Sequence, residues 1–544
     1  KLESLEIPAS VTSIGNEVFN GCVALKSIEI PEGVTKIGKQ TFMGSGLESI
    51  SFPGSLASIA DAAFKNCVDL VSVTLPSGSD YTSVSASLFE GCVNLSSVAF
   101  SANVEEIGAN AFSGCTALAQ VTLPGSLIEI GDSAFEGCVT LSEIMLPGSV
   151  ELIGDAAFRN CVLLKNVYFS EAVTFIGDYA FAGCVQLAQA VLPDALVSLG
   201  AYAFSGTGLK EITLPAGLSV LSEGTFENCA ALEKVVLTES ISEIGDYAFK
   251  NCAKLSEIEI LSGVVSLGVN PFFGCASLDT YIIAEESESF MLIDGVLFGA
   301  DGKTLYSYPA GKEGSYTVAD GVTVRPYAFA GADLSELIVS DGATLLDGAL
   351  AGGTFGSVQL PSSLKTLPNS LFKDAKIGAV TIPSGVTVIG EYAFQGAEID
   401  SIVIPNAVTT ISQYAFEGSS LSNLTFESGG TEGLTIGTYA FANCTSLEHL
   451  VVPSRVRVAY TSSVTPVDNY AFYGCTSLLD VVFEETPASG GVEGVLRLAQ
   501  YVFAGCTSLK SAEFPSALGR TTSNVWGIYS YSFDGCVSLE SVTL

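Results

Sequence analysis

Fourteen cysteines have the greatest capacity for chemistry in this sequence, because a thiolate can attack carbon, bind zinc or form a disulfide. Each cysteine lies three residues after a phenylalanine, and no Cys-x-x-Cys pair occurs. Where cysteine is missing, the same position holds a small residue such as Ser45 or Ala397. This exchange favours packing over reactivity. We predict a buried column of free thiols that includes Cys92, Cys138 and Cys184, with disulfides or a thiolate metal site as the alternatives.

The single histidine, His449, would have to serve any Ser-His-Asp triad, Cys-His pair or histidine metal site. It lies in a short strand-like stretch, where a solvent-facing side chain is expected. The sequence has no phosphate-binding loop, no dinucleotide-binding glycine motif after a strand and no His-Glu-x-x-His motif. Carboxylate pairs such as Glu105 and Glu106 are common in so acidic a chain. We therefore predict no catalytic residues, no metal site, no cofactor and no enzymatic activity.

The charge balance narrows the choice of partner. Among 544 residues, 58 are Asp or Glu and 22 are Lys or Arg, which gives a net charge of −36. Such a chain repels nucleic acid and anionic lipid headgroups. No apolar run approaches the roughly 18 residues that span a bilayer, so we expect no direct membrane insertion in this segment. Both ends of the sequence fall inside a repeated motif, as if cut from something longer.

One repeat organises the chain, and we call the phenylalanine that marks each copy its anchor. The anchors are Phe19, Phe42, Phe64, Phe89, Phe112, Phe135, Phe158, Phe181, Phe204, Phe226, Phe249, Phe272, Phe329, Phe372, Phe394, Phe416, Phe441, Phe472, Phe503 and Phe533, with Leu350 standing in once. A copy is too small to bury its apolar side chains alone. Stacked copies are therefore expected to form a solenoid.

The copy at 118–138, LAQVTLPGSLIEIGDSAFEGC, shows what each part should do. Its first segment alternates apolar and polar residues, which indicates a strand, and Pro124 ends it. We expect residues 118–123 to pair in parallel with 141–146. Asp132 has the position of a helix cap, and the spacing leaves room for one 3-10 turn before Phe135.

This pattern resembles the BspA-like leucine-rich repeats, whose units read LxxIxIPxxVxxIGxxAFxxC. Residues 2–22 and 255–275 show it, although Leu261 replaces the expected proline. The resemblance implies a β-rich α/β repeat solenoid, a curved right-handed superhelix with a parallel sheet on its concave face and short turns or 3-10 helices opposite.

The regular spacing of the anchors is interrupted once, between Phe272 and Phe329, and this interruption divides the chain into three parts. We predict an N-terminal arc at 1–283, a hairpin-bearing insert at 284–321 and a C-terminal arc at 322–544. The insert contains DGVLFGADGKTLYSYPAGK, two alternating runs around residues 300–302 that suggest a hairpin. The C-terminal arc has three enlarged repeats, whose additions at 455–466, 487–495 and 519–526 should form loops.

The fifth position of each strand should face outward on the concave sheet, and here apolar residues recur. The candidate binding stripe consists of Met145, Tyr168, Val191, Val236 and Ile282. The alternative is that these residues only reflect strand propensity. Three sequons, at Asn94, Asn423 and Asn443, are possible N-glycosylation sites.

Together these features suggest a non-enzymatic binding or adhesion protein of the cell surface or extracellular matrix, with protein or glycan partners. That setting is implied mainly by the family resemblance, since members are often surface-exposed. The alternative is a structural scaffold or spacer in a larger assembly, with the cytoplasm as the alternative location and with end-to-end or side-by-side self-association.

Overall fold

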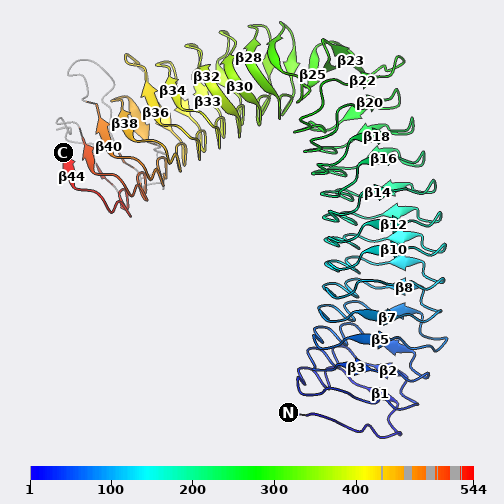
Figure 1. The fold of residues 1–544 in the computed structure, drawn as a ribbon. Coiled ribbons are helices and arrows are strands. Elements are labelled where there is room, and N and C mark those ends of the chain that lie inside the picture. The colour runs from blue at the N-terminus through cyan, green and yellow to red at the C-terminus, as the bar shows by residue number, and fades with distance from the viewer. Residues whose placement is uncertain are drawn as a thin grey trace. The chain divides into compact units, whose positions relative to one another are not determined.

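The computed structural model describes residues 2–430, 433–458, 469–484, 497–498, 500–514, 527–528 and 530–543. These residues form a parallel β-solenoid, as predicted, in which strands alternate with turns (Figure 1). They contain no helix, so the alternative of 3-10 helices was wrong and that of short turns was right. The segment around each anchor cannot continue as a helix because it includes left-handed residues, for example Ser133 at φ 53° and Gly137 at φ 69°.

The chain divides into two compact units, Lys1–Phe290 and Met291–Leu544. In each unit, successive repeats build two ladders of strands. In most repeats the first ladder receives the strand that follows the turn after an anchor, and the second ladder receives the shorter strand that precedes the next anchor.

The strands of the first unit are as follows. Its first ladder consists of β3 (Ser49–Ile50), β5 (Ser72–Thr74), β7 (Ser97–Ala99), β10 (Glu143–Met145), β12 (Asn166–Tyr168), β14 (Gln189–Ala190), β16 (Glu211–Thr213), β18 (Lys234–Val236), β20 (Glu259–Ile260) and β22 (Ile282–Ile283). Its second ladder consists of β1 (Ser13–Ile14), β2 (Lys36–Ile37), β4 (Ser58–Ile59), β6 (Ser83–Val84), β8 (Glu106–Ile107), β9 (Glu129–Ile130), β11 (Leu152–Ile153), β13 (Phe175–Ile176), β15 (Ser198–Leu199), β17 (Val220–Leu221), β19 (Glu243–Ile244) and β21 (Ser266–Leu267).

The second unit is built in the same way. Its first ladder consists of β26 (Gly314–Val318), β28 (Asp333–Val339), β30 (Thr354–Gln359), β32 (Lys376–Thr381), β34 (Ser401–Ile404), β36 (Asn423–Phe426), β38 (His449–Val452), β40 (Asp480–Phe483), β42 (Ser511–Glu513) and β44 (Ser541–Thr543). Its second ladder consists of β27 (Thr323–Val324), β29 (Thr344–Leu345), β31 (Thr366–Leu367), β33 (Val388–Ile389), β35 (Thr410–Ile411), β37 (Leu434–Ile436), β39 (Val456–Val458), β41 (Arg497–Leu498) and β43 (Gly527–Ile528).

Pairing within the first ladder runs between equivalent residues of successive repeats. In β10 and β12, Met145 pairs with Tyr168 in a parallel register, and the middle residue of each strand is buried while its neighbours are exposed. Residues 118–123 depart from the prediction. They form only a single bridge, between Thr122 and Ala99, and contact the next repeat through the Ser142 N–H that donates to the Ala119 carbonyl.

The predicted hairpin is confirmed and lies at the start of the second unit. Strand β24 (Val296–Gly299) pairs antiparallel with β25 (Thr304–Ser307), and β23 (Phe290–Ile293) lies on the other side of β24. The Asp301 carboxylate closes the turn by accepting the backbone N–H groups of Lys303 at 2.8 Å and Thr304 at 3.0 Å. Strand β25 then pairs in parallel with β27, which is the first strand of the second ladder in this unit. The hairpin therefore occupies the edge at which this ladder begins.

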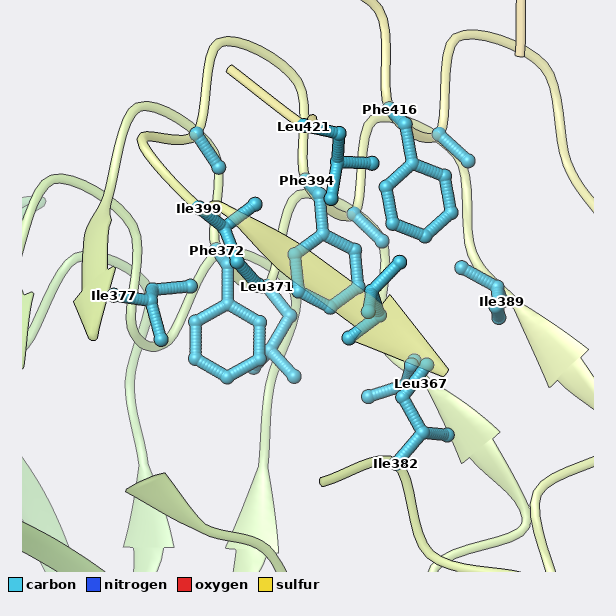
Figure 2. Close-up of a cluster of buried hydrophobic side chains, with 14 of the residues drawn as sticks. Leu367, Leu371, Phe372, Ile377, Ile382, Ile389, Phe394, Ile399, Phe416 and Leu421 are labelled. Carbon is cyan, nitrogen blue, oxygen red and sulfur yellow. The ribbon is translucent and has the colours of Figure 1, made fainter. Parts of the chain in front are cut away.

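The predicted core is present. Every anchor is buried except Phe533, which is partly exposed. Neighbouring anchor rings stack face to face, for example Phe112 on Phe135 with centroids 5.3 Å apart. Figure 2 shows the same arrangement in the second unit, where Phe372, Phe394 and Phe416 form one row of rings. Each copy therefore completes the core of its neighbours.

All fourteen cysteines are free thiols, and every one except Cys22 and Cys536 is buried. Beyond packing, the thiols make a repeated hydrogen bond. The Cys138 thiol donates to the Phe112 carbonyl of the preceding repeat at 3.3 Å, and Cys161 donates to the Phe135 carbonyl at 3.2 Å. Burial raises the pKa of Cys161 to about 12, so this thiol keeps its proton at neutral pH. A buried, protonated thiol is a poor nucleophile, so packing and this hydrogen bond account for the cysteine.

The three loops expected in the enlarged repeats fall largely outside the described residues. The additions at 487–495 and 519–526 lie wholly outside, as does 459–466 of the first. Arg455, at the start of the first addition, points back into the repeats, because its guanidinium donates to the carbonyls of Val408 at 2.8 Å and Pro405 at 3.3 Å.

Candidate binding surface

The candidate stripe lies on the outward side of the first ladder, as expected from its alternation. Met145 is 69% exposed, Tyr168 51% and Val191 84%. Met145 and Tyr168 pair with each other across adjacent repeats, and Val191 directly follows the paired strand β14, so these side chains are presented on a hydrogen-bonded sheet. An apolar side chain held outward in this way costs little conformational entropy when a partner covers it.

The structure brings together only part of the stripe. Met145, Tyr168 and Val191 belong to three successive repeats, whose strands β10, β12 and β14 form one sheet. Val236 and Ile282 are also exposed but lie on other sheets. Each pairs with a polar neighbour, which is Thr213 beside Val236 and Glu259 beside Ile282. We call Met145, Tyr168 and Val191 the apolar patch.

A shallow cavity of about 220 Å³ lies beside the apolar patch. It is lined by Asn166, Val167, Tyr168, Phe169, Glu171, Gln189, Val191, Leu192 and Pro193. Tyr168 and Val191 of the patch thus form part of the cavity wall. The side chains of Asn166, Gln189 and Glu171 supply its polar groups. Apolar walls with a few polar groups are typical of recognition sites. Sequence reasoning missed this cavity, because it depends on how two neighbouring turns are spaced.

The fold also builds an aromatic feature that the sequence analysis did not identify. Tyrosine recurs two residues before the anchor, and in the second unit six such rings stack on one another: Tyr392, Tyr414, Tyr439, Tyr470, Tyr501 and Tyr531. We call this row the tyrosine column. The recurring Tyr-Ala-Phe sequence was the signal that could have revealed it.

His449 occupies the solvent-facing position that the sequence suggested. It lies in β38, and its Nδ1 atom is 2.6 Å from a carboxylate oxygen of Asp480, on the neighbouring strand β40. The His449 side chain is exposed and that of Asp480 is partly exposed, so this pair contributes little stability. In the part of the chain that the structure describes, no cluster of His, Cys, Asp or Glu is placed to hold a metal ion. Over the same residues, no helix has the length and apolar character needed to cross a bilayer.

The three sequon asparagines are all exposed. Asn94 and Asn443 lie in cysteine turns and Asn423 begins β36. Asn443 adopts a left-handed conformation at φ 57°, and its backbone N–H donates to the Tyr473 carbonyl at 2.7 Å. Their side chains are therefore accessible for modification, which stays a prediction.

Solved structures with similar folds include those of two leucine-rich proteins. A leucine-rich cell surface protein of Faecalibacterium prausnitzii is 23% identical, with 78% of this chain and 88% of that chain covered and a TM-score of 0.36. A leucine-rich repeat protein of Bacteroides ovatus is 22% identical, with coverage of 95% and 88% and a TM-score of 0.30. At such identities and TM-scores, these likenesses carry no argument about function. No curated protein matches this sequence.

The family model described as a BspA type leucine-rich repeat region, with six copies, matches residues 1–97, 82–196, 174–292, 322–448 and 435–544. These segments cover most of the chain and include both units. Their repeats are the ones whose anchors, thiols and ladders are described above. The chain therefore belongs to the BspA-type leucine-rich repeat family.

Proposed function

We propose that this protein is a non-enzymatic adhesion protein of the cell surface or extracellular space that captures a protein partner on the apolar patch of its first unit. The observation that supports this most is the 51% exposure of Tyr168 on a hydrogen-bonded strand, at the wall of a cavity. Tyrosine is enriched among residues that dominate binding energy, because its large ring loses few rotamers on binding.

The polar groups near the patch favour a partner with basic character. Glu143 lies on the strand that ends in Met145, and Glu171 lines the cavity. The whole chain carries a net charge of −36. A protein that offers an apolar side chain surrounded by Lys or Arg would match both the patch and its charge.

Replacing Tyr168 by alanine tests the proposal. We expect Tyr168→Ala to weaken partner capture by more than about 1 kcal/mol, because the exposed ring is lost from the centre of the patch. The melting temperature should barely change, since the ring does not belong to the core. Binding is measured by biolayer interferometry against a panel of purified extracellular-matrix proteins.

The matched control is Tyr179→Ala, which removes another exposed ring from the same repeat, outside the patch. It should leave capture unchanged. Equal losses in the two variants, or unchanged capture by Tyr168→Ala, would show that the patch is not the binding site.

The salt dependence of the association rate provides an independent test of the proposal. For a matrix protein captured on this patch, the association rate should fall as sodium chloride is raised from about 0.05 M to about 0.5 M, because screening removes long-range steering. The dissociation rate should change much less, since it depends on apolar contact. Stopped-flow or interferometric kinetics measure both rates. An association rate that is independent of salt would contradict a basic partner.

A further inference from the structure

The tyrosine column of the second unit forms an aromatic surface separate from the residues of the apolar patch. Its six rings are nearly parallel, with centroids 4.6 to 5.3 Å apart and interplanar angles of 1 to 13°. The faces of the inner rings are covered by their neighbours. The column therefore offers ring edges and not ring faces, and its residues are half-buried except for Tyr531, which is 59% exposed. The phenol hydroxyl of tyrosine can both donate and accept hydrogen bonds.

The rings of the column are carried by residues with a left-handed backbone conformation. Tyr392, Tyr414, Tyr439, Tyr501 and Tyr531 all adopt left-handed φ angles, between 56 and 63°. Bulky residues rarely adopt this conformation. In two other repeats the equivalent position is glycine, Gly224 and Gly348, which takes it without strain. The equivalent positions Ala62 and Ser133 are left-handed as well, so the repeat imposes this turn on whatever residue stands there. The distinctive feature of the second unit is that six consecutive repeats place tyrosine at it.

A seventh ring, that of Tyr473, packs against the edges of the column. Tyr473 stands nearly perpendicular to two column rings, at 79° to Tyr439 and 78° to Tyr470. Both faces of these two rings are already covered, so Tyr473 contacts their edges. Its own side chain is outside the column and is 39% exposed. An aromatic face of this kind attracts the partially positive C–H groups of a ligand.

Charge is absent from the middle of this surface. The segments 438–443, 469–474 and 500–505, which carry Tyr439, Tyr470, Tyr473 and Tyr501, contain no Asp, Glu, Lys or Arg. The corresponding turns of the first unit do contain charges, for example Asp178 beside Tyr179. The polar residues that directly precede two of the middle rings, Thr438 and Gln500, are neutral. Charges lie toward the start of the column, where Glu391 precedes Tyr392 and the Lys373 ammonium is 6.0 Å from the centroid of the Tyr392 ring.

We propose that the tyrosine column and Tyr473 bind an uncharged polysaccharide chain. Such a polymer has hydroxyl groups for the row of phenols and amides, and C–H faces for the ring of Tyr473. Its repeated units suit a surface that itself repeats at a constant interval. This site uses residues of the second unit and does not depend on the apolar patch.

Charge argues against the other occupants. An anionic polymer would be repelled by a chain with a net charge of −36. A second copy of this chain would suffer the same repulsion. A basic protein would find no counter-charge in these three segments, although many carboxylates are available elsewhere.

The probe is native electrophoresis in gels that contain hydroxyethylcellulose, galactomannan or dextran as neutral polymers, with alginate as the anionic comparison. We expect at least one neutral polymer to retard the protein, with retardation unaffected by salt. Tyr473→Ala should weaken this binding by about tenfold, and Tyr473→Phe should retain most of it. Gln500→Glu, which adds a charge beside Tyr501 without touching the core, should weaken it several-fold.

The control Tyr168→Ala should be retarded like the unmodified protein, which separates this site from the apolar patch. The proposal is wrong if none of the three neutral polymers retards the protein, if only alginate does, or if Tyr473→Ala and Gln500→Glu, both still folded by melting, bind as the unmodified protein does. Dimers in sedimentation that dissociate in Tyr473→Ala, with no retardation by polysaccharide, would assign the surface to self-association instead.

Discussion

Replacing Phe135 by alanine is expected to lower the free energy of unfolding of the first unit by about 3–5 kcal/mol. The ring is fully buried and lies between two others, with centroids 5.3 Å from Phe112 and 5.4 Å from Phe158. Removing it leaves a cavity and takes one stacking contact from each neighbouring repeat. Because repeats gain stability from their interfaces, both interfaces weaken together. Guanidinium denaturation followed by far-UV circular dichroism measures the effect.

Phe175→Ala is the matched control for this experiment. Phe175 is also a phenylalanine of the first unit, but it lies on the exposed side of β13. Its removal should change the free energy of unfolding by less than about 1 kcal/mol. If the two variants lose similar stability, the anchors do not form the stacked core described here.

Raising the pH is expected to unfold the first unit cooperatively between about pH 9 and pH 11. Burial raises the pKa of Cys115, Cys161 and Cys275 to about 12. In the unfolded chain these thiols ionise at their usual pKa near 9. The folded state therefore binds more protons between these values, so the stability is fully present below pH 9 and is lost as pH rises toward 12.

The size of this loss can be estimated. One pH unit above the unfolded pKa costs about 1.4 kcal/mol for each such thiol. Three of them amount to about 4 kcal/mol at pH 10, a large part of the stability of a typical domain. Thiolate absorbance near 240 nm and circular dichroism should therefore change together. Gradual ionisation at pH 8 to 9 with intact circular dichroism would contradict burial of the thiols.

Much of the fold could be predicted because the same residue type recurs at equivalent positions of many repeats. The anchors and the middle residues of the first-ladder strands are apolar in nearly every copy, so their burial follows from periodicity alone. The outward direction of Tyr168 followed from the same alternation. The hairpin at 296–307 was visible because two alternating runs flank residues 300–302.

What could not be predicted depends on contacts between copies. The thiols were identified as packing groups, but the hydrogen bond from Cys138 to the Phe112 carbonyl exists only when two repeats stack in one register. The turn before Phe135 was expected to be helical, because its polar start resembles a cap. Left-handed Ser133 prevents this, and no sequence rule forbids serine from adopting a helical conformation. The cavity near Tyr168 and the tyrosine column likewise arise from stacking.

The stacking of Phe112 on Phe135 joins residues only 23 positions apart in the chain, and this interval recurs through most of the first unit. The sequence separation of native contacts thus stays near one repeat however long the array becomes. Loop-closure entropy, which slows the folding of most large β-proteins, does not accumulate with length in such an array. A chain emerging from the ribosome can add each repeat to the one before it as soon as that repeat is complete.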